Sequence, residues 1–233
     1  MAESQQNPGS GALVLLSGGL DSATTLYLAR SKHSAITGLS FDYGQRHRIE
    51  LDRAAEIARV AGIEHHLIKL DASVFVGTSL VDRSMAVPEE RSDEAMATGI
   101  PSTYVPGRNI LFLSFALSYA EGHGLSAIYI GANAVDYSGY PDCRPEFFEA
   151  FQAMANAGTR AGQEGHPVRV ETPLIRLTKA EIIRIGTDLG VDYSLTSSCY
   201  QPDDEGRPCQ KCDSCQLRLR GFQQAGLIDP LTA

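Results

Sequence analysis

Hydrophobic residues fall in short runs along the chain, and longer segments with a helical spacing of apolar positions separate these runs. The runs that we predict to be β-strands are Ala12–Leu16, Ile36–Tyr43, His65–Leu70, Ala127–Ala132 and Val168–Thr172. The segments that we predict to be helices are Asp21–Ser31, Gln45–Ala61, Asn109–His123, Pro145–Arg160 and Thr178–Leu189. Strands that alternate with helices indicate a parallel sheet covered on both faces. The pattern therefore predicts an α/β fold with a parallel five-stranded sheet and helices on both faces.

Local signals mark the ends of several predicted helices. Gly62 and Gly190 follow the last apolar positions of their segments, where glycine commonly ends a helix. Thr178 and Glu181 have the spacing of a capping box, in which each side chain bonds the backbone N–H of the other residue. We therefore expect sharp boundaries at these positions.

A long polar segment without clear periodicity runs from Asp71 to Arg108. Connections of this length are uncommon in compact domains and tend to be lids, binding loops or partner contacts. Within it, the charged stretch from Pro88 to Glu94 is typical of a solvated surface, and we interpret it in that way.

The most informative motif follows the first predicted strand and reads Ser-Gly-Gly-Leu-Asp-Ser, from Ser17 to Ser22. Two glycines let main-chain N–H groups approach an anion closely, and the next helix adds its N-terminal N–H groups. Both serine hydroxyls can donate to the same anion. A plain helix start, capped by Asp21 or Ser22, accounts for the last residues of the motif but not for its glycines. We therefore predict a phosphate-binding loop, which lacks the Lys-Ser/Thr pair of the common P-loop.

The distinctive polar stretches all follow predicted strands. The loop at 17–22 follows the first strand, residues 41–47 follow the second, and residues 133–144 follow the fourth. In open parallel sheets, ligands bind beyond the carboxyl ends of the strands. We therefore expect these stretches to form one composite site.

Composition narrows the class of protein. A chain of 233 residues with a net charge of −8 fits one α/β domain with an appendage. The acidic balance argues against a general binder of nucleic acid or of a membrane surface, and no apolar stretch approaches the ~20 residues that span a bilayer. Residues 1–11 are polar and carry no signal-peptide pattern. We expect a disordered lead over 1–11, an ATP-binding domain over 12–195 and a metal-binding segment over 196–233, in a cytoplasmic protein without nucleic-acid or membrane partners.

Four of the five cysteines lie near the C-terminus, at Cys199, Cys209, Cys212 and Cys215. Thiolates at this spacing can surround one tetrahedral cation, and a closed set of four leaves no position open for chemistry. A disulfide framework would be unusual in a cytosolic chain, whereas an iron–sulfur cluster or a set of free thiols would also account for four cysteines. We favour one structural Zn²⁺ per chain, which would fold a segment that is poor in large apolar residues.

Three further stretches make the assignment more specific: residues 105–109 (Val-Pro-Gly-Arg-Asn), residues 131–147, and Ser198-Cys199-Tyr200 with the CxxCxxC motif. Together with the loop and residues 42–47, they resemble the 7-cyano-7-deazaguanine synthase family of the ATP pyrophosphatase (PP-loop) superfamily. The resemblance extends from Ala12 to Phe222. The sequence departs from the family pattern at Ser197, where we expect an aromatic residue.

The resemblance implies an adenine nucleotide alpha-hydrolase-like fold, a homodimer and an ATP-dependent carbon–nitrogen ligase. Enzymes of this family convert 7-carboxy-7-deazaguanine, ammonia and ATP to 7-cyano-7-deazaguanine, the nitrile precursor of queuosine, through an adenylated carboxylate and an adenylated amide. No His-Cys pair marks a glutamine-hydrolysing site, so we expect free ammonium as the nitrogen source. The competing functions are another PP-loop synthetase or tRNA thiolase, a relative that stops at the amide, and an ATP sensor or zinc-stabilised interaction module.

Candidate residues follow from the motifs and the resemblance. We expect Asp21 to act in catalysis, and its carboxylate can cap its helix or bind Mg²⁺. Two cations near helix N-termini, Arg108 and Lys179, would act with it and face the departing pyrophosphate. A surface ion pair is the competing role for each cation. The stretch expected to bind ATP with Mg²⁺ comprises Leu16, Ser17, Gly18, Gly19, Leu20, Asp21, Ser22, Ala23, Thr24, Thr25 and Leu26. For the deazapurine substrate, the resemblance points to Asp136, Tyr137, Tyr140, Asp142 and Arg144.

Overall fold

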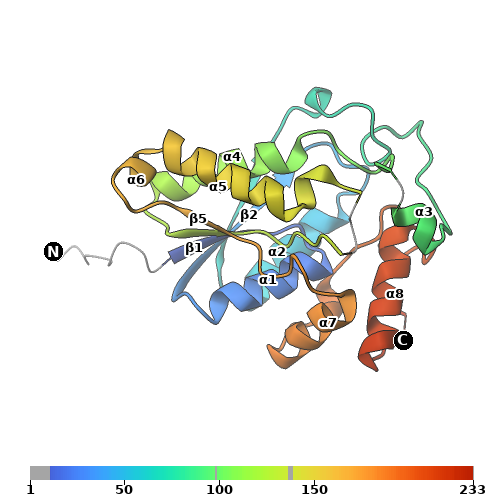
Figure 1. Cartoon of the computed structure of the whole chain (residues 1–233). Helices are drawn as coiled ribbons and strands as arrows, with labels where there is room; N and C mark the ends of the chain where they lie inside the picture. Colours follow the sequence, from blue (N-terminus) through green and yellow to red (C-terminus); the bar gives the residue numbers. More distant parts are fainter. Residues whose placement is uncertain (1–10, 98, 136–138, 233) are drawn as a thin grey trace.

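A computed structural model describes residues 11–97, 99–135 and 139–232 of the chain. Its sheet has five parallel strands in the order β3-β2-β1-β4-β5 (Figure 1). The strands are β1 (Gly11–Leu15), β2 (Ala35–Asp42), β3 (Glu64–Lys69), β4 (Ala127–Tyr129) and β5 (Arg169–Glu171). The predicted sheet is thus confirmed, with strand ends shifted by no more than three residues.

Helices connect these strands as the sequence predicts. The five expected helices are α1 (Leu20–Arg30), α2 (Ile49–Ala61), α4 (Arg108–Gly122), α5 (Pro145–Gly158) and α7 (Lys179–Asp188). The sequence did not predict the short helices α3 (Asp93–Ala97) and α6 (Arg160–Gln163), the longer α8 (Asp213–Ala225), or the 3-10 turns η1 (Ala72–Val74), η2 (Pro141–Cys143) and η3 (Tyr193–Leu195). No helix within the described ranges is long and apolar enough to cross a membrane.

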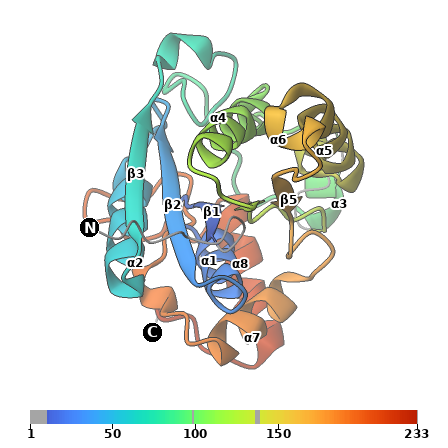
Figure 2. The same cartoon turned by 90° about the vertical axis from the view of Figure 1, so that its left-hand side faces the viewer.

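The sheet separates two hydrophobic cores, with α4 and α5 over one face and α1, α2 and α7 over the other (Figures 1 and 2). Successive side chains of a strand point to opposite faces, and β1 divides its residues accordingly. Ala12 and Val14 pack in the core with α1 and α7, whereas Leu13 and Leu15 pack in the core with α4 and α5. β1 is therefore buried on both faces, which fixes the position of the loop that follows it.

The first strand and the second helix begin at other residues than expected. Gly11, assigned to the disordered lead, is the first residue of β1, while the rest of that lead lies outside the described residues. α2 begins at Ile49 and not at Gln45. The Gln45 side chain accepts a hydrogen bond from the backbone N–H of Tyr43 (2.9 Å) and donates to the carbonyl of Phe41 (3.2 Å), which keeps it in the loop after β2. These side-chain bonds compete with the helix and delay its start.

Three predicted helix boundaries are confirmed. Gly62 is the C-cap of α2 in a left-handed conformation with φ of 66°. Gly190 also has a positive φ, of 82°, directly after the C-cap residue Leu189. Thr178 caps α7 in a complete capping box with Glu181. These boundaries depend on adjacent residues alone, and local sequence therefore predicts them.

The charged stretch 88–94 is largely exposed, as its composition predicts, but it also contacts the cysteine segment, which we did not expect. Glu90 donates its backbone N–H to the carbonyl of Lys211 (2.9 Å), and Glu89 forms an isolated antiparallel bridge with Cys212. The Arg91 guanidinium forms an ion pair with Asp213, whose side chain is only 7% exposed. The stretch therefore packs against the cysteine segment at Arg91, whose partner lies 122 residues further along the chain.

Candidate active site

One cavity lies at the carboxyl ends of the central strands, where the strand order reverses between β1 and β4. Open α/β sheets bind ligands at this switch point. The cavity is lined by residues that follow β1, β2 and β4, together with the N-terminal ends of α1, α2 and α4. The polar residues among them are Ser17, Asp21, Ser22, Ser40, Tyr43, Gln45, Glu50, Arg108, Asn109, Asn133, Tyr140, Cys143, Ser197, Ser198, Tyr200 and Ser214. The structure therefore brings the three predicted stretches together.

The Gly-Gly loop has a backbone that a side chain would disrupt. Gly18 has φ of +84°, and a Cβ at this position would lie 2.2 Å from the carbonyl oxygen of Glu50. Gly19 is the N-cap of α1, and no side chain caps this helix, so neither Asp21 nor Ser22 takes the capping role. The hydroxyl of Ser22 instead accepts the backbone N–H of Ser17 (3.2 Å). The loop is thus tightly folded at a helix N-terminus, a geometry that suits an anion.

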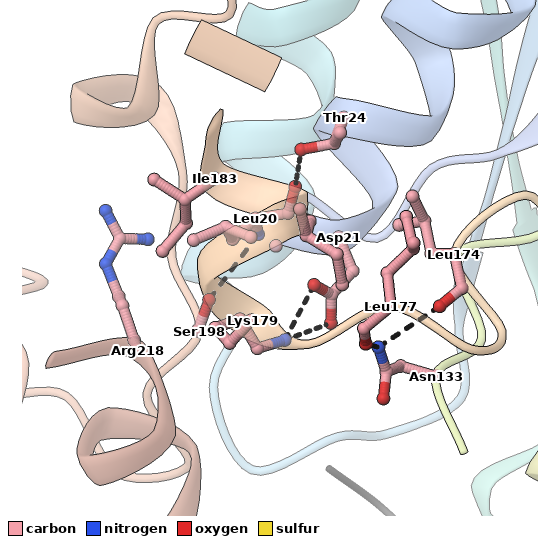
Figure 3. A network of polar contacts seen from close by, with 12 residues as sticks. Leu20, Asp21, Thr24, Asn133, Leu174, Leu177, Lys179, Ile183, Ser198 and Arg218 are labelled. Carbon is pink, nitrogen blue, oxygen red and sulfur yellow. Dashed lines mark hydrogen bonds and ion pairs between the residues drawn. The ribbon is translucent and has the colours of Figure 1, made fainter. Parts of the chain in front are cut away.

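Asp21 and Lys179 form an ion pair at the edge of the cavity (Figure 3). The Lys179 ammonium lies 2.7 and 2.8 Å from the two oxygens of Asp21, and the side chains are 8% and 20% exposed. Lys179 begins α7 and is covered by α8, where a Cβ on Gly221 would lie 2.3 Å from the lysine Cγ. Asp21 lines the cavity and Lys179 does not. The lysine is therefore buried, which excludes a surface ion pair as its role.

Arg108 lines the cavity on the opposite side of the sheet switch point, at the first residue of α4. Its guanidinium donates to the hydroxyl of Tyr43 at 3.4 Å. Burial raises the pKa of Tyr43, and the nearby positive charge of Arg108 opposes this increase. A cation at this place can act on an anionic ligand in the cavity.

The residues expected to hold the deazapurine fall in different places. Tyr140 lines the cavity, and its hydroxyl is hydrogen-bonded to Thr103 at 2.6 Å. Asp142 is buried behind the wall, where it accepts the backbone N–H of Asn109 at the start of α4 (3.2 Å). Arg144 is exposed and does not line the cavity. Asp136 and Tyr137 lie outside the described residues.

The predicted ATP stretch divides into two parts. Leu16, Ser17, Gly19, Leu20, Asp21 and Ser22 line the cavity. Gly18 does not line it but shapes the loop, while Ala23 and Leu26 are buried in the core of α1. Thr24 and Thr25 are also fully buried, and Thr24 bonds the hydroxyl of Tyr193 (2.9 Å). The part of the stretch beyond Ser22 therefore supports the loop from behind.

Sequence reasoning missed the residues that reach the loop from other segments. Ser197 donates its backbone N–H to the carbonyl of Gly18 (2.9 Å), and the Ser198 hydroxyl accepts the N–H of Leu20 at 3.5 Å (Figure 3). The bond from Ser197 uses its backbone N–H, so the identity of this residue gave no signal for the contact. Glu50 carried no signal, because a charged residue early in an amphipathic helix is normally on its surface.

The cavity wall changes the ionisation of two further groups. Burial raises the pKa of Glu50 to about 7, although the charge of Arg108 opposes the shift. Burial also raises the pKa of the Cys143 thiol to about 12, which keeps it protonated. Cys143 lines the cavity as a neutral thiol, and Glu50 is the group that titrates near neutral pH.

The four C-terminal cysteines can hold one metal ion. Their sulfur atoms all lie within 4.8 Å of one another. Four sulfurs that each lie ~2.3 Å from a tetrahedral ion are about 3.8 Å apart, and the Cys209 and Cys215 sulfurs lie at 3.9 Å. Backbone N–H groups donate to the sulfurs of Cys199, Cys209 and Cys212 at 3.2 to 3.5 Å. Such donors favour the thiolate form, which is the form that binds metals.

A doubly wound parallel sheet with a Gly-Gly loop before α1 and a cavity at the switch point defines the class as a PP-loop nucleotide-using protein. The model of the queuosine biosynthesis protein QueC family matches residues 11–226. A 7-cyano-7-deazaguanine synthase from Pseudomonas savastanoi pv. phaseolicola is 57% identical over 220 residues, which cover 94% of each chain. One from Paramagnetospirillum magneticum is 54% identical over 94% of this chain and 96% of its own. The chain belongs to this family of enzymes.

The fold also occurs in more distant proteins. A solved complex of a 4-thiouridine synthetase with RNA and bound ATP matches 93% of this chain and 50% of that chain, with a TM-score of 0.50. Its sequence identity to this chain is 17%, so the likeness shows a shared fold alone.

Proposed function

We propose that this enzyme converts 7-carboxy-7-deazaguanine, ammonia and ATP to 7-cyano-7-deazaguanine, with adenylated carboxylate and amide intermediates. The observation that carries the proposal is the loop at 17–22, which opens into the cavity at a helix N-terminus in a chain of this family. The carboxylate of the substrate is a poor electrophile. Transfer of AMP to it gives a leaving group that ammonia can displace, and a second transfer to the amide oxygen allows the nitrile to form.

In this proposal the protein positions the reacting groups and stabilises phosphate charge. Ser17, Ser22 and the backbone of the loop hold the phosphates. Arg108 stabilises the departing pyrophosphate from the far wall of the cavity. Lys179 holds Asp21 in place beside the loop through both carboxylate oxygens, and the remaining lone pairs of these oxygens can accept Mg²⁺ that arrives with ATP.

For the deazapurine, we propose that Tyr140 stacks against the ring and that Asp136, Tyr137 and Arg144 complete the substrate site on the same segment. The position of Tyr140 in the cavity wall supports this role. In our proposal Asp142 acts through Asn109 and Arg108. Burial raises the pKa of Asp142, while the Arg108 charge and the Asn109 N–H oppose that shift.

We propose that the cysteine cluster holds one Zn²⁺ per chain in a structural role. The donor set of four sulfurs at tetrahedral spacing supports this choice. Elemental analysis should give one zinc per chain. Iron with a visible absorption band would favour an iron–sulfur cluster instead.

We further propose that the enzyme is a cytoplasmic homodimer with small-molecule partners only. Four cysteines grouped as candidate metal ligands suit a reducing compartment. The division at residues 12–195 and 196–233 stays a prediction. Sedimentation of the purified chain at several concentrations tests the dimer.

The function is tested by incubation of the protein with 7-carboxy-7-deazaguanine, ammonium and ATP, followed by mass analysis of the products. AMP and the nitrile are the expected products. ADP in place of AMP would contradict adenylation. An amide end product would favour the relative that stops at the first stage, and ATP binding without turnover would favour a sensor.

A further inference from the structure

A carboxylate without a role in the chemistry above lies in the wall of the cavity. Glu50 is the second residue of α2 and lines the cavity together with Ser17, Asp21 and Arg108. Its backbone is fixed against the loop, because its carbonyl oxygen occupies the space where a Gly18 Cβ would lie. The carboxylate is therefore carried by a rigid helix turn in direct contact with the phosphate loop.

Within residues 11–97, 99–135 and 139–232, no hydrogen bond or ion pair involves the Glu50 side chain. Apolar side chains such as Leu51, Leu80 and Phe112 line the same cavity. Burial raises the pKa of this carboxyl from 4.5 to about 7 against the lowering effect of Arg108. A group that titrates near the working pH can both accept and return a proton.

Other titratable groups that face the cavity are less suited to accept a proton. Asp21 is neutralised by Lys179, and burial keeps the hydroxyls of Tyr43 and Tyr140 and the thiol of Cys143 protonated by raising their pKa. No histidine is among the described residues that line this cavity. Among those residues, the carboxylates are Asp21 and Glu50.

Under the proposed function, on which this inference rests, the nitrogen loses one proton in the first stage and two in the second. Attack of ammonia on the adenylated carboxylate forms the C–N bond, breaks the C–O bond to AMP and releases a proton from nitrogen. Transfer of AMP to the amide oxygen forms an O–P bond, turns the C–N bond into a C=N bond and releases a second proton from nitrogen. Elimination of AMP from this adenylated amide then breaks the C–O bond and the last N–H bond, forms the nitrile and releases a third proton. We propose that Glu50 accepts these protons and passes them to water between stages.

Replacement of Glu50 by glutamine keeps its size and removes its ability to accept a proton. For Glu50→Gln we expect kcat to fall by about 100-fold or more, because positioned proton transfer contributes about 10²–10⁴-fold. The Kd for MgATP should change less than about twofold. Glu56→Gln is the matched control, since Glu56 lies on the same helix with a 39% exposed side chain and should leave kcat unchanged.

The pH dependence separates proton transfer from a structural role. In the wild type, kcat at saturating ammonium should fall as the pH drops below about 7, and the glutamine variant should lose this step. The folded-state pKa lies above the unfolded one, so ionised Glu50 destabilises the native state above pH 7 and has no such effect below pH 4.5. Glu50→Gln should therefore unfold at a higher temperature than the wild type at pH 8 and at the same temperature at pH 4.

The outcomes are distinct. Wild-type protein that yields no nitrile rejects the proposed function, whereas active wild type with an equally active glutamine variant rejects the role of Glu50 alone. A large loss of MgATP affinity in the variant would mean that Glu50 binds the metal, which also overturns the inference. Should the variant fail to fold, a wild-type kcat that stays constant from pH 8 to pH 6 would overturn it.

Discussion

The phosphate loop (residues 17–22) and the cysteine cluster are both short motifs, but their shapes come from different sources. In the cluster, Cys209, Cys212 and Cys215 lie within seven residues, and two neighbouring backbone N–H groups donate to the Cys209 sulfur. The loop instead depends on distant segments, since the carbonyl of Glu50 packs on Gly18 and the N–H of residue 197 bonds it. A metal can order its own ligands, whereas a glycine loop takes its conformation from what surrounds it.

The two regions are nevertheless joined. Ser197 and Ser198, which bond the loop, come directly before Cys199 of the cysteine cluster. α8 starts at the cluster and packs Gly221 against Lys179, the partner of Asp21. We therefore expect loss of the metal to damage the loop, and damage to the loop to leave the metal in place.

The largest effect should follow removal of the metal, by a strong chelator or by Cys212→Ser. Structural zinc supplies ~10–16 kcal/mol in small peptides, so the C-terminal segment should lose its order before the sheet does. Hydrogen exchange should accelerate in α8, and MgATP affinity should fall at least about tenfold as the loop loses its contacts. Cys143→Ser should keep the metal. Unchanged exchange in a metal-free protein would show that the cluster is not structural.

A second large effect is expected for Gly18→Ala. The new Cβ would lie 2.2 Å from the Glu50 carbonyl, so the loop or α2 must shift. A shift of about 1 Å costs on the order of 100-fold in turnover, measured as AMP release. Gly62→Ala is the control, because Gly62 also has a positive φ but no atom within 4 Å of its Cβ position. Equal activities of the two variants would rule out a loop shaped by Glu50, and the metal content of both should stay at one per chain.

Lys179→Met should have an intermediate effect. The substitution removes the counter-charge of Asp21, whose side chain is only 20% exposed. We expect this loss to lower the free energy of unfolding by about 2 kcal/mol. Asp21→Asn in the same chain should restore part of that stability but not the turnover. Arg59→Met breaks the exposed pair with Glu56 and should leave the free energy of unfolding nearly unchanged. Denaturant unfolding measures all of these variants, and additive losses in the double variant would argue against the ion pair.

The smallest effect is expected for Ser198→Ala. It removes one long hydrogen bond of 3.5 Å to the N–H of Leu20, worth about 0.5 kcal/mol. The KM for ATP should rise about twofold at constant kcat, and the metal content should not change. Ser194→Ala, which removes a surface bond to Asp192, should leave KM unaltered. If KM is the same in both variants, the Ser198 hydroxyl does not contribute to the link between the two regions.

Patterns confined to a few neighbouring residues were predicted well from the sequence. The strands, Gly62 and the Thr178 capping box agree with the structure because pleat, left-handed glycine and capping each involve residues that are close in sequence. α8 was missed because it begins within the cysteine cluster. The cysteines occupy positions at which apolar residues would otherwise mark a helix, so its pattern does not stand out. The late start of α2 was missed because Gln45 bonds the backbone before it.

The sequence by itself determined the sheet, the place of the phosphate loop and the sulfur ligands, since each is a local pattern of chain geometry or donor chemistry. Tertiary structure alone decided that Lys179 would face Asp21, that Arg91 would pair with Asp213, and that Glu50 would line the cavity. These contacts join residues far apart in the chain. Their charges acquire partners, or lose water, only when the folded helices bring them together.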